Sequence, residues 1–181
     1  KGETVYYEIV GFTHDGKSIM GQCSNDKVKD KDFVKQYGKT TTFSYGCSPN
    51  AVVSPQSDIY VYRMTMTNED GDVVEMSPDQ VRMRCEQMGV KTVPVFERFI
   101  IPERQITYDD GHFVETEDVN PGEYVVRKVE EYFDGPDPIG KTHIREGVVA
   151  RIVSRPNIAV YKHKNFSFKV LEGIIKDEAE T

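Results

Sequence analysis

Five stretches of the sequence alternate apolar with polar residues, a pattern typical of half-buried β-strands. They cover residues 4–11, 58–66, 72–76, 146–153 and 157–164. Because successive side chains of a strand point to opposite faces, each stretch is expected to bury one face. Asp-Gly pairs at 15–16 and 70–71 predict tight turns, and the second turn joins two antiparallel strands. The chain is therefore expected to build mostly antiparallel sheets.

Three other segments carry helix signals, at residues 77–89, 122–133 and 165–180. In the first, Ser77 is placed to cap the helix, Pro78 occupies the first helical position, and Gly89 ends it. Strands and helices together predict a single α+β domain over residues 1–181. Within it, residues 101–141 are predicted to form an acidic, loop-rich insertion.

The charges are distributed unevenly along the chain. The net charge of the 181 residues is −7, which argues against a uniformly basic nucleic-acid binder. Residues 103–137 hold eleven acids and three bases, whereas residues 145–176 hold two acids and seven bases. The basic segment could meet phosphates although the total is negative. An ordinary charged surface is the alternative.

Cysteine usage and hydropathy limit the class of protein further. Three widely spaced cysteines without a C-x-x-C pair indicate neither a disulfide framework nor a thiolate zinc site. No apolar run is long enough to cross a bilayer. These features favour a protein of a reducing, cytoplasmic compartment without a membrane partner.

Two lysines stand on a strand face that otherwise suits burial. Val160, Lys162 and Lys164 share this face because they are two residues apart. By the same alternation, Glu146 heads the face that is completed by Val148, Ala150 and Ile152. An unpaired ion is unfavourable in a protein interior, so these charges should meet one another, a ligand or a metal. A structural ion pair between Glu146 and Lys162 is one of the open alternatives.

The first two strand stretches raise the same question. Glu8 shares a face with Tyr6 and Val10, which makes it another acid on an apolar face. Tyr62 is predicted to lie on one face with Tyr60, Met64 and Met66. Plain core packing is the alternative reading of Tyr62.

Taken in order, four of the strand segments resemble conserved motifs of the covalent nucleotidyltransferase superfamily. "VYYEIVG" is similar to motif III, "IYVYRM" to motif IIIa, "EGVVAR" to motif IV, and "VYKHKNFSFK" to motif V with its paired lysines. The resemblance is strongest to ATP-dependent RNA ligases of the second phage-type family and to RNA-editing ligases. It implies the C-terminal part of a nucleotidyltransferase adenylation domain, with ATP-grasp-like antiparallel sheets and flanking helices.

The resemblance also implies a role for each matching residue. Glu8 is expected to bind the adenosine ribose, and Tyr62 to stack on the adenine ring. Glu146 is expected to bind a divalent metal, Mg²⁺ or Mn²⁺, or to orient the reacting lysine. Lys162 and Lys164 are expected to contact the ATP phosphates, where a compact ammonium charge suits phosphoryl transfer.

Two departures from the family pattern stand out. An acid often follows the motif IIIa aromatic, but here the residue is Arg63, and no role is carried over to it. The K-x-D-G motif that holds the nucleophilic lysine does not occur in the 181 residues. The chain is therefore expected to be the later half of the domain, completed by an upstream part of the same polypeptide and inactive alone in self-adenylylation.

The activity implied by the resemblance is ATP-dependent RNA ligation. RNA 5′-phosphate and 3′-hydroxyl ends would be joined through lysyl-AMP and AMP-RNA intermediates, as in RNA repair, in the cytoplasm or, for a phage-encoded chain, in the host cytoplasm. A DNA ligase and an mRNA-capping guanylyltransferase are alternatives that share these motifs. A non-catalytic nucleotide- or RNA-binding module is a third.

Overall fold

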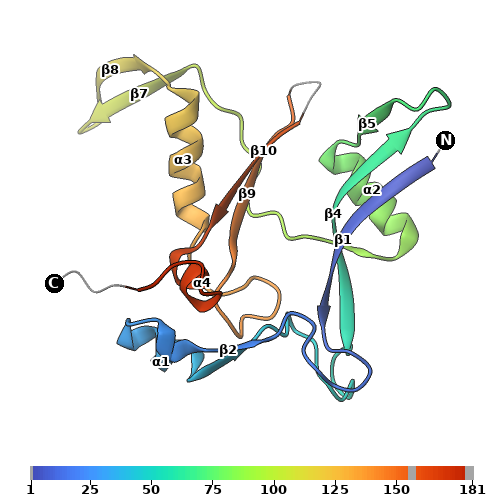
Figure 1. The fold of residues 1–181 in the computed structure, drawn as a ribbon. Coiled ribbons are helices and arrows are strands. Elements are labelled where there is room, and N and C mark those ends of the chain that lie inside the picture. The colour runs from blue at the N-terminus through green and yellow to red at the C-terminus, as the bar shows by residue number, and fades with distance from the viewer. Residues whose placement is uncertain (1, 155–157, 178–181) are drawn as a thin grey trace.

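The computed structural model of the chain describes residues 2–154 and 158–177, and it shows a mixed α+β fold (Figure 1). In this part of the chain the strands are β1 (Gly2–Gly11), β2 (Gln22–Ser24), β3 (Thr40–Thr42), β4 (Ser57–Thr67), β5 (Val73–Glu75), β6 (Lys91–Thr92), β7 (Arg104–Asp109), β8 (His112–Asp118), β9 (Gly147–Ile152) and β10 (Ala159–Lys164). The helices are α1 (Lys31–Tyr37), α2 (Pro78–Met88), α3 (Pro121–Tyr132) and α4 (Phe166–Leu171), with a 3-10 turn at Asn25–Lys27. The predicted α+β class is confirmed.

The largest sheet of the described residues is built around β4. β4 pairs antiparallel with β1 and β5 and parallel with β6. A β-bulge interrupts the β1–β4 register beside Tyr62, because Tyr6 pairs with Arg63 while Tyr7 pairs with Val61. A bulge inserts one extra residue and shifts the alternation of side chains beyond it.

The bulge corrects one prediction about the face of Tyr62. Val61 and Met64 pack in the same core cluster, against Val81 and Cys85 of α2. Met64 therefore does not share a face with Tyr60 as predicted, because the extra residue places Val61 and Met64 on the same side of the sheet. α2 covers that side and leaves the side of Tyr60 and Glu8 uncovered by this helix.

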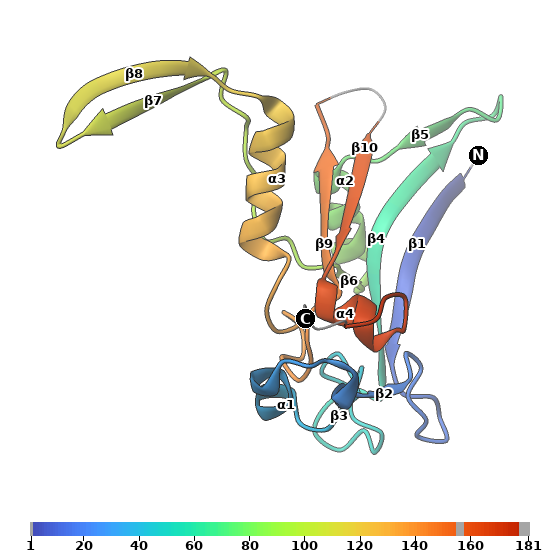
Figure 2. The ribbon, with the colours of Figure 1, turned by 60° about the vertical axis from the view of Figure 1, so that its left-hand side comes forward.

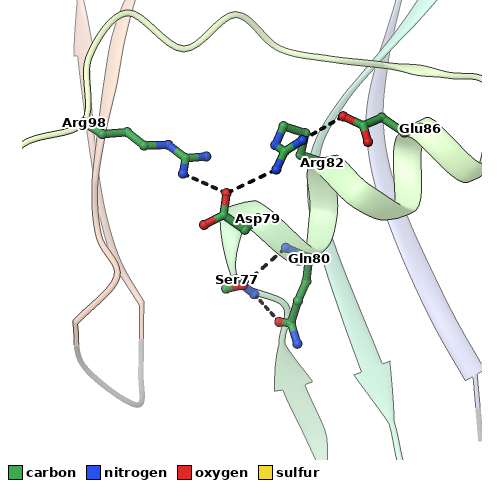
Figure 3. Close-up of polar contacts among 6 residues, drawn as sticks. All are labelled: Ser77, Asp79, Gln80, Arg82, Glu86 and Arg98. Carbon is green, nitrogen blue, oxygen red and sulfur yellow. Dashed lines mark hydrogen bonds and ion pairs between the residues drawn. The ribbon is translucent and has the colours of Figure 1, made fainter.

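Helix α2 begins and ends where the sequence predicts. The Ser77 hydroxyl accepts from the Gln80 backbone N–H, and the Gln80 side chain accepts from the Ser77 N–H, which forms a capping box (Figure 3). Gly89 ends the helix in the left-handed conformation. Asp79 in the first turn also pairs with Arg98 at 2.8 Å, which ties the segment after β6 to this helix (Figure 3).

A second core lies under α1 and α4. Its buried members are Val28, Phe33, Phe43, Ile144, Phe168, Val170 and Leu171. They come from both ends of the chain, so this core joins the segment around β2 and β3 to the segment that follows β10. The short elements α1, β2 and β3 were not predicted from the sequence.

The region predicted to be loop-rich contains an ordered hairpin. β7 and β8 pair antiparallel around a turn at Asp110 and Gly111, both of which have positive φ. In both views the hairpin projects from the N-terminal end of α3, away from the rest of the chain (Figures 1 and 2). The predicted acidic, loop-rich insertion over residues 101–141 therefore contains two strands that were not predicted.

The β9–β10 hairpin stands between α3 and the sheet of β1 and β4 (Figures 1 and 2). α3 packs along β9, and the Phe133 ring at its end meets the His163 ring edge-on, with centroids 4.9 Å apart. The following helix, α4, ends at Leu171, and Gly173 has a positive φ of 75°. The helix predicted through residue 180 is thus shorter, and residues 178–180 lie outside the described part. No helix among the described residues is long and apolar enough to cross a membrane.

Candidate functional site

Glu146 holds both lysines of the sequence motif at one point. Lys162 Nζ lies 2.8 Å from Glu146 Oε1, and Lys164 Nζ lies 3.5 Å from the same oxygen. The two lysines alternate with His163 on β10, so they leave the same face of the strand. The expectation that these charges meet is confirmed, and the open alternative of a Glu146–Lys162 ion pair is present in the structure.

Gly147 makes this meeting possible. It pairs with Lys164 at the start of β9 and has a φ of +149°, a conformation that residues with a Cβ rarely adopt. A Cβ at this position would lie 2.0 Å from the His163 carbonyl oxygen and 2.9 Å from Lys164 Cα. β10 can therefore approach this closely only because residue 147 is glycine.

Glu146 does not lie on the strand face on which it was predicted. Val148 pairs with His163, so strand alternation puts Val148 on the His163 face and not on the face of the two lysines. Glu146 reaches the lysines because it precedes β9, which begins only at Gly147. The outcome was predicted correctly, but Glu146 does not belong to the face of Val148, Ala150 and Ile152.

Lys164 is held between two carboxylates. Besides Glu146, its ammonium pairs with Glu172, which follows α4, and it lies 5.2 Å from the centroid of the Phe168 ring. Burial lowers the pKa of Lys164, but the hydrogen bond and charge of Glu172 and those of Glu146 outweigh burial and raise this pKa above its usual value. Lys164 is therefore a fixed cation, whereas Lys162 is 62% exposed and open to an incoming anion.

Asn165 fixes the junction between β10 and α4. Its backbone N–H donates to the Glu146 carbonyl oxygen at 2.7 Å, and its side-chain oxygen caps α4 by accepting from the Phe168 N–H at 3.1 Å. Its side-chain amide donates to Asp134 at 2.9 Å. Asn165 is buried, so these bonds hold Glu146 in register with the lysines.

Glu146 gives the site a dependence on pH. Burial raises the pKa of Glu146, but the hydrogen bonds and charges of Lys162 and Lys164 outweigh burial, and the pKa lies below its ordinary value of 4.5. A lowered carboxyl pKa adds stability above the ordinary value, and this stability is lost as pH falls through the lowered value.

We therefore expect the wild-type chain to lose more stability than Glu146→Gln as pH falls below 4.5. Urea denaturation of both proteins between neutral and acidic pH measures the difference in their free energies of unfolding. The difference should shrink with acidification. A difference that stays constant from neutral pH to well below 4.5 would contradict the pairing of Glu146 with the lysines.

Glu8 and Tyr62 lie on the large sheet. Glu8 pairs directly with Tyr60, and its exposed carboxylate makes no hydrogen bond or ion pair with other described residues. The Tyr62 ring lies 6.4 Å from the Tyr6 ring, between centroids, at an angle of 47°. An aromatic surface and a free acceptor therefore stand on the side of the sheet away from α2.

Arg63, to which the sequence assigned no role, braces this aromatic surface. Its guanidinium carbon lies 4.5 Å from the centroid of the Tyr6 ring, and its Nε donates to Glu75 Oε1 at 2.7 Å. A guanidinium over a ring face is attracted by the ring quadrupole. The arginine that replaces the usual acid therefore has a structural partner on β5.

Tyr45 connects the large sheet to the lysine site, and it was not found from the sequence. Its ring packs against both the core under α4 and the core that contains Tyr60. Burial, and then the negative charges of Glu146, Asp137, Glu8 and Glu172, raise the pKa of its phenol. Glu8 of the large sheet and Glu146 of the lysine site thus act on the same side chain. No local sequence signal marks Tyr45 or Glu172 for these positions.

The described residues contain no group of three or more His, Cys, Asp and Glu side chains that could hold a metal ion. Magnesium in phosphate-transfer sites is usually held by one or two carboxylates together with substrate phosphates and water. Glu146 supplies such a carboxylate beside two cations. Its donor chemistry therefore fits Mg²⁺ or Mn²⁺ that arrives with phosphates.

A comparison with protein families decides the class of the chain. A family model described as RNA ligase matches residues 5–171. The chain belongs to the RNA ligase family. No curated protein and no solved structure matches it significantly. The α+β architecture fits the nucleotidyltransferase-like fold of RNA ligases, and membership supports an RNA ligase-type function.

The RNA ligase match spans every residue that the sequence singled out. Glu8, Tyr62, Glu146, Lys162 and Lys164 all lie within residues 5–171, whereas Glu172 lies just beyond them. The structure brings Glu146 and the two lysines together and places Glu8 and Tyr62 on the neighbouring sheet. Their individual roles in this RNA ligase stay predictions.

Proposed function

We propose that this chain is the phosphate-binding part of an ATP-dependent RNA ligase, which joins RNA 5′-phosphate and 3′-hydroxyl ends through lysyl-AMP and AMP-RNA. One observation carries the proposal: a single carboxylate, Glu146, holds Lys162 and Lys164 on one strand face, with Lys162 open to solvent. No K-x-D-G motif occurs in the 181 residues. The reacting lysine therefore lies outside them, and the chain alone is inactive in self-adenylylation.

The two lysines have different tasks in this proposal. Lys162, which is mostly exposed, releases Glu146 and turns to a phosphate oxygen of ATP. Lys164, fixed by Glu146 and Glu172, supplies a positive charge that needs no rearrangement as negative charge moves between phosphate oxygens. Preorganised charge of this kind is the main contribution that a protein makes to phosphoryl transfer.

Glu8 and the tyrosines complete the nucleotide site. The Glu8 carboxylate, which is without a protein partner among the described residues, accepts from the ribose hydroxyls. Tyr62, braced through Tyr6 and Arg63, offers a face on which adenine stacks. Bound Mg²⁺ or Mn²⁺ would neutralise phosphate charge, and Glu146 would be its protein ligand.

The last chemical step can be tested with this chain because it requires no reacting lysine. In AMP-RNA, the 3′-hydroxyl oxygen of one RNA end attacks the 5′-phosphorus of the other. A new P–O bond forms, the bond to AMP breaks, AMP leaves with the electron pair, and the hydroxyl proton passes to solvent. Fixed cations next to this phosphorus stabilise the leaving AMP.

We expect the chain, supplied with Mg²⁺ or Mn²⁺, to join a pre-adenylylated RNA to an RNA with a free 3′-hydroxyl. Lys164→Ala should slow joining by at least about 100-fold, which is the usual cost of removing one charge-stabilising group. Lys35→Ala removes an exposed lysine on α1 and should leave the rate unchanged. The assay follows the longer product on a denaturing gel.

Three outcomes would count against the proposal. Equal joining rates for wild type and Lys164→Ala would exclude Lys164 from the site. Absence of joining together with retained ATP binding would favour a non-catalytic nucleotide-binding module, the alternative that the missing K-x-D-G motif supports. A DNA-specific enzyme would join the matching DNA substrates in place of RNA.

A further inference from the structure

A hollow of about 530 Å³ lies between the β7–β8 hairpin and α3, apart from the lysine site. β7 contributes one wall and α3 the other. The lining includes Arg104, Ile106, Tyr124, Arg127, Lys128 and Glu131. Three of these six side chains are cationic and one is acidic, although the surrounding segment is rich in acids.

The pairing of the hairpin keeps several of the acids away from this hollow. Glu115 pairs with Thr107 and therefore lies on the strand face opposite to Ile106. Glu117, Asp118 and Glu123 line a second, adjoining hollow, and Arg127 lines both hollows. Glu117 and Glu123 thus line only the second hollow, whereas Arg127 borders both.

Arg127 is the cation that is left available. Lys128 pairs with Glu97 and Glu131, both at 3.2 Å, and Arg104 pairs with Asp118 at 3.1 Å. Within residues 2–154 and 158–177, Arg127 makes no hydrogen bond or ion pair. Its guanidinium carbon lies 5.6 Å from the centroid of the Tyr124 ring. A free guanidinium and an aromatic ring are therefore presented side by side.

Tyr124 is held in place from behind. The Phe99 ring lies 5.8 Å from the Tyr124 ring, between centroids, and Lys128 lies 6.0 Å from the centroid of Phe99. Lys128 is itself fixed by Glu97, so α3 and the segment after β6 form one supported wall. A supported aromatic ring loses little freedom when a flat ligand stacks on it.

We propose that this hollow binds single-stranded RNA, with a base stacked on Tyr124 and a phosphate on Arg127. Cations along a groove with an interleaved aromatic ring are the usual features of single-strand binding without sequence preference. An unpaired arginine suits the phosphate because it can donate two parallel hydrogen bonds. The inference rests on the proposed function and deepens it by assigning a place to the RNA beyond the joined ends.

The location agrees with such a role. Arg127 is six residues before Phe133, which corresponds to roughly 9 Å along a helix axis, and Phe133 contacts His163 of the lysine-bearing strand. RNA in the hollow would therefore lie beside the β9–β10 hairpin.

Fluorescence anisotropy with a labelled single-stranded RNA of mixed sequence tests the inference on the full chain. Tyr124→Ala is expected to weaken binding by about tenfold, the usual loss for one stacked base. Arg127→Ala should weaken binding at low salt and reduce the slope of log affinity against log salt by about one. Arg82→Ala is the matched control, because Arg82 is an exposed arginine of α2 already paired with Glu86.

ATP binding by the same variants separates this inference from the proposed function. Both variants should bind ATP like the wild type, which also shows that they are folded. RNA affinity that is equal in wild type, Arg127→Ala and Tyr124→Ala would overturn the inference and leave the ligase proposal intact, and so would a wild type that binds no RNA. That result is also the one expected if the hollow receives a protein. A wild type that binds no ATP would instead overturn the proposed function.

Discussion

Gly147→Ala is expected to destabilise the chain by about 2 to 4 kcal/mol, because it combines backbone strain with a backbone collision. The φ of +149° is rarely adopted by alanine, and the new methyl group would lie 2.0 Å from the His163 carbonyl oxygen. This oxygen belongs to the backbone, so it cannot turn aside as the end of a flexible side chain would. β10 would have to move away from β9, and Lys164 would lose its place beside Glu146.

Gly173→Ala is the matched control for this prediction. Gly173 also has a positive φ, 75°, but no atom lies within 4 Å of a Cβ built there. This variant should cost only the strain of a left-handed residue, about 1 kcal/mol. Urea denaturation of both variants separates strain from collision. Equal stability of the two variants would show that β9 and β10 are not packed as closely as described.

The strand pattern predicted the large elements of this fold because alternation depends only on neighbouring residues. β1, β4, β9 and β10 follow from it, whereas the start and end of α2 follow from Ser77, Pro78 and Gly89. The bulge beside Tyr62 could not be predicted, since it depends on how β1 and β4 are aligned. Because of this bulge, Met64 lies with Val61 under α2 and not on the face of Tyr60.

The β7–β8 hairpin shows where composition misled the prediction. Asp110 and Gly111 form the same Asp-Gly signal that predicted turns elsewhere, but the many acids around them indicated a solvated loop. Short elements such as α1 and β3 have too few residues to show a period. Their position is set by the core that they share with α4, which forms only in the folded chain.

The site was predicted in part and for mixed reasons. Lys162 and Lys164 share a face as alternation requires, but Glu146 joins them from outside the strand. Glu172 and Tyr45 reach the site from segments far apart in the sequence, so no local pattern marks them. Gly147 was visible only as part of a short motif, and its geometry explains why no side chain fits there.

Lys164→Ala is expected to weaken ATP binding to this chain by about 10- to 100-fold. A hydrogen bond to a charged group contributes about 1.5 to 3 kcal/mol, and the partners left behind add to the loss. Without Lys164, Glu146 keeps only Lys162, and Glu172 faces the incoming phosphates with an unpaired negative charge. Lys162→Ala should weaken binding less, because the exposed Lys162 must first be immobilised.

The most direct test of the phosphate-binding site is calorimetric titration of the chain with ATP in the presence of Mg²⁺. Wild type and Lys35→Ala should bind with the same affinity, and Lys164→Ala with an affinity at least about tenfold lower. The affinity of the wild type for ATP should also fall in concentrated salt, because salt screens exposed charges. Equal ATP affinity in wild type, Lys162→Ala and Lys164→Ala would contradict the assignment of these lysines to the phosphates.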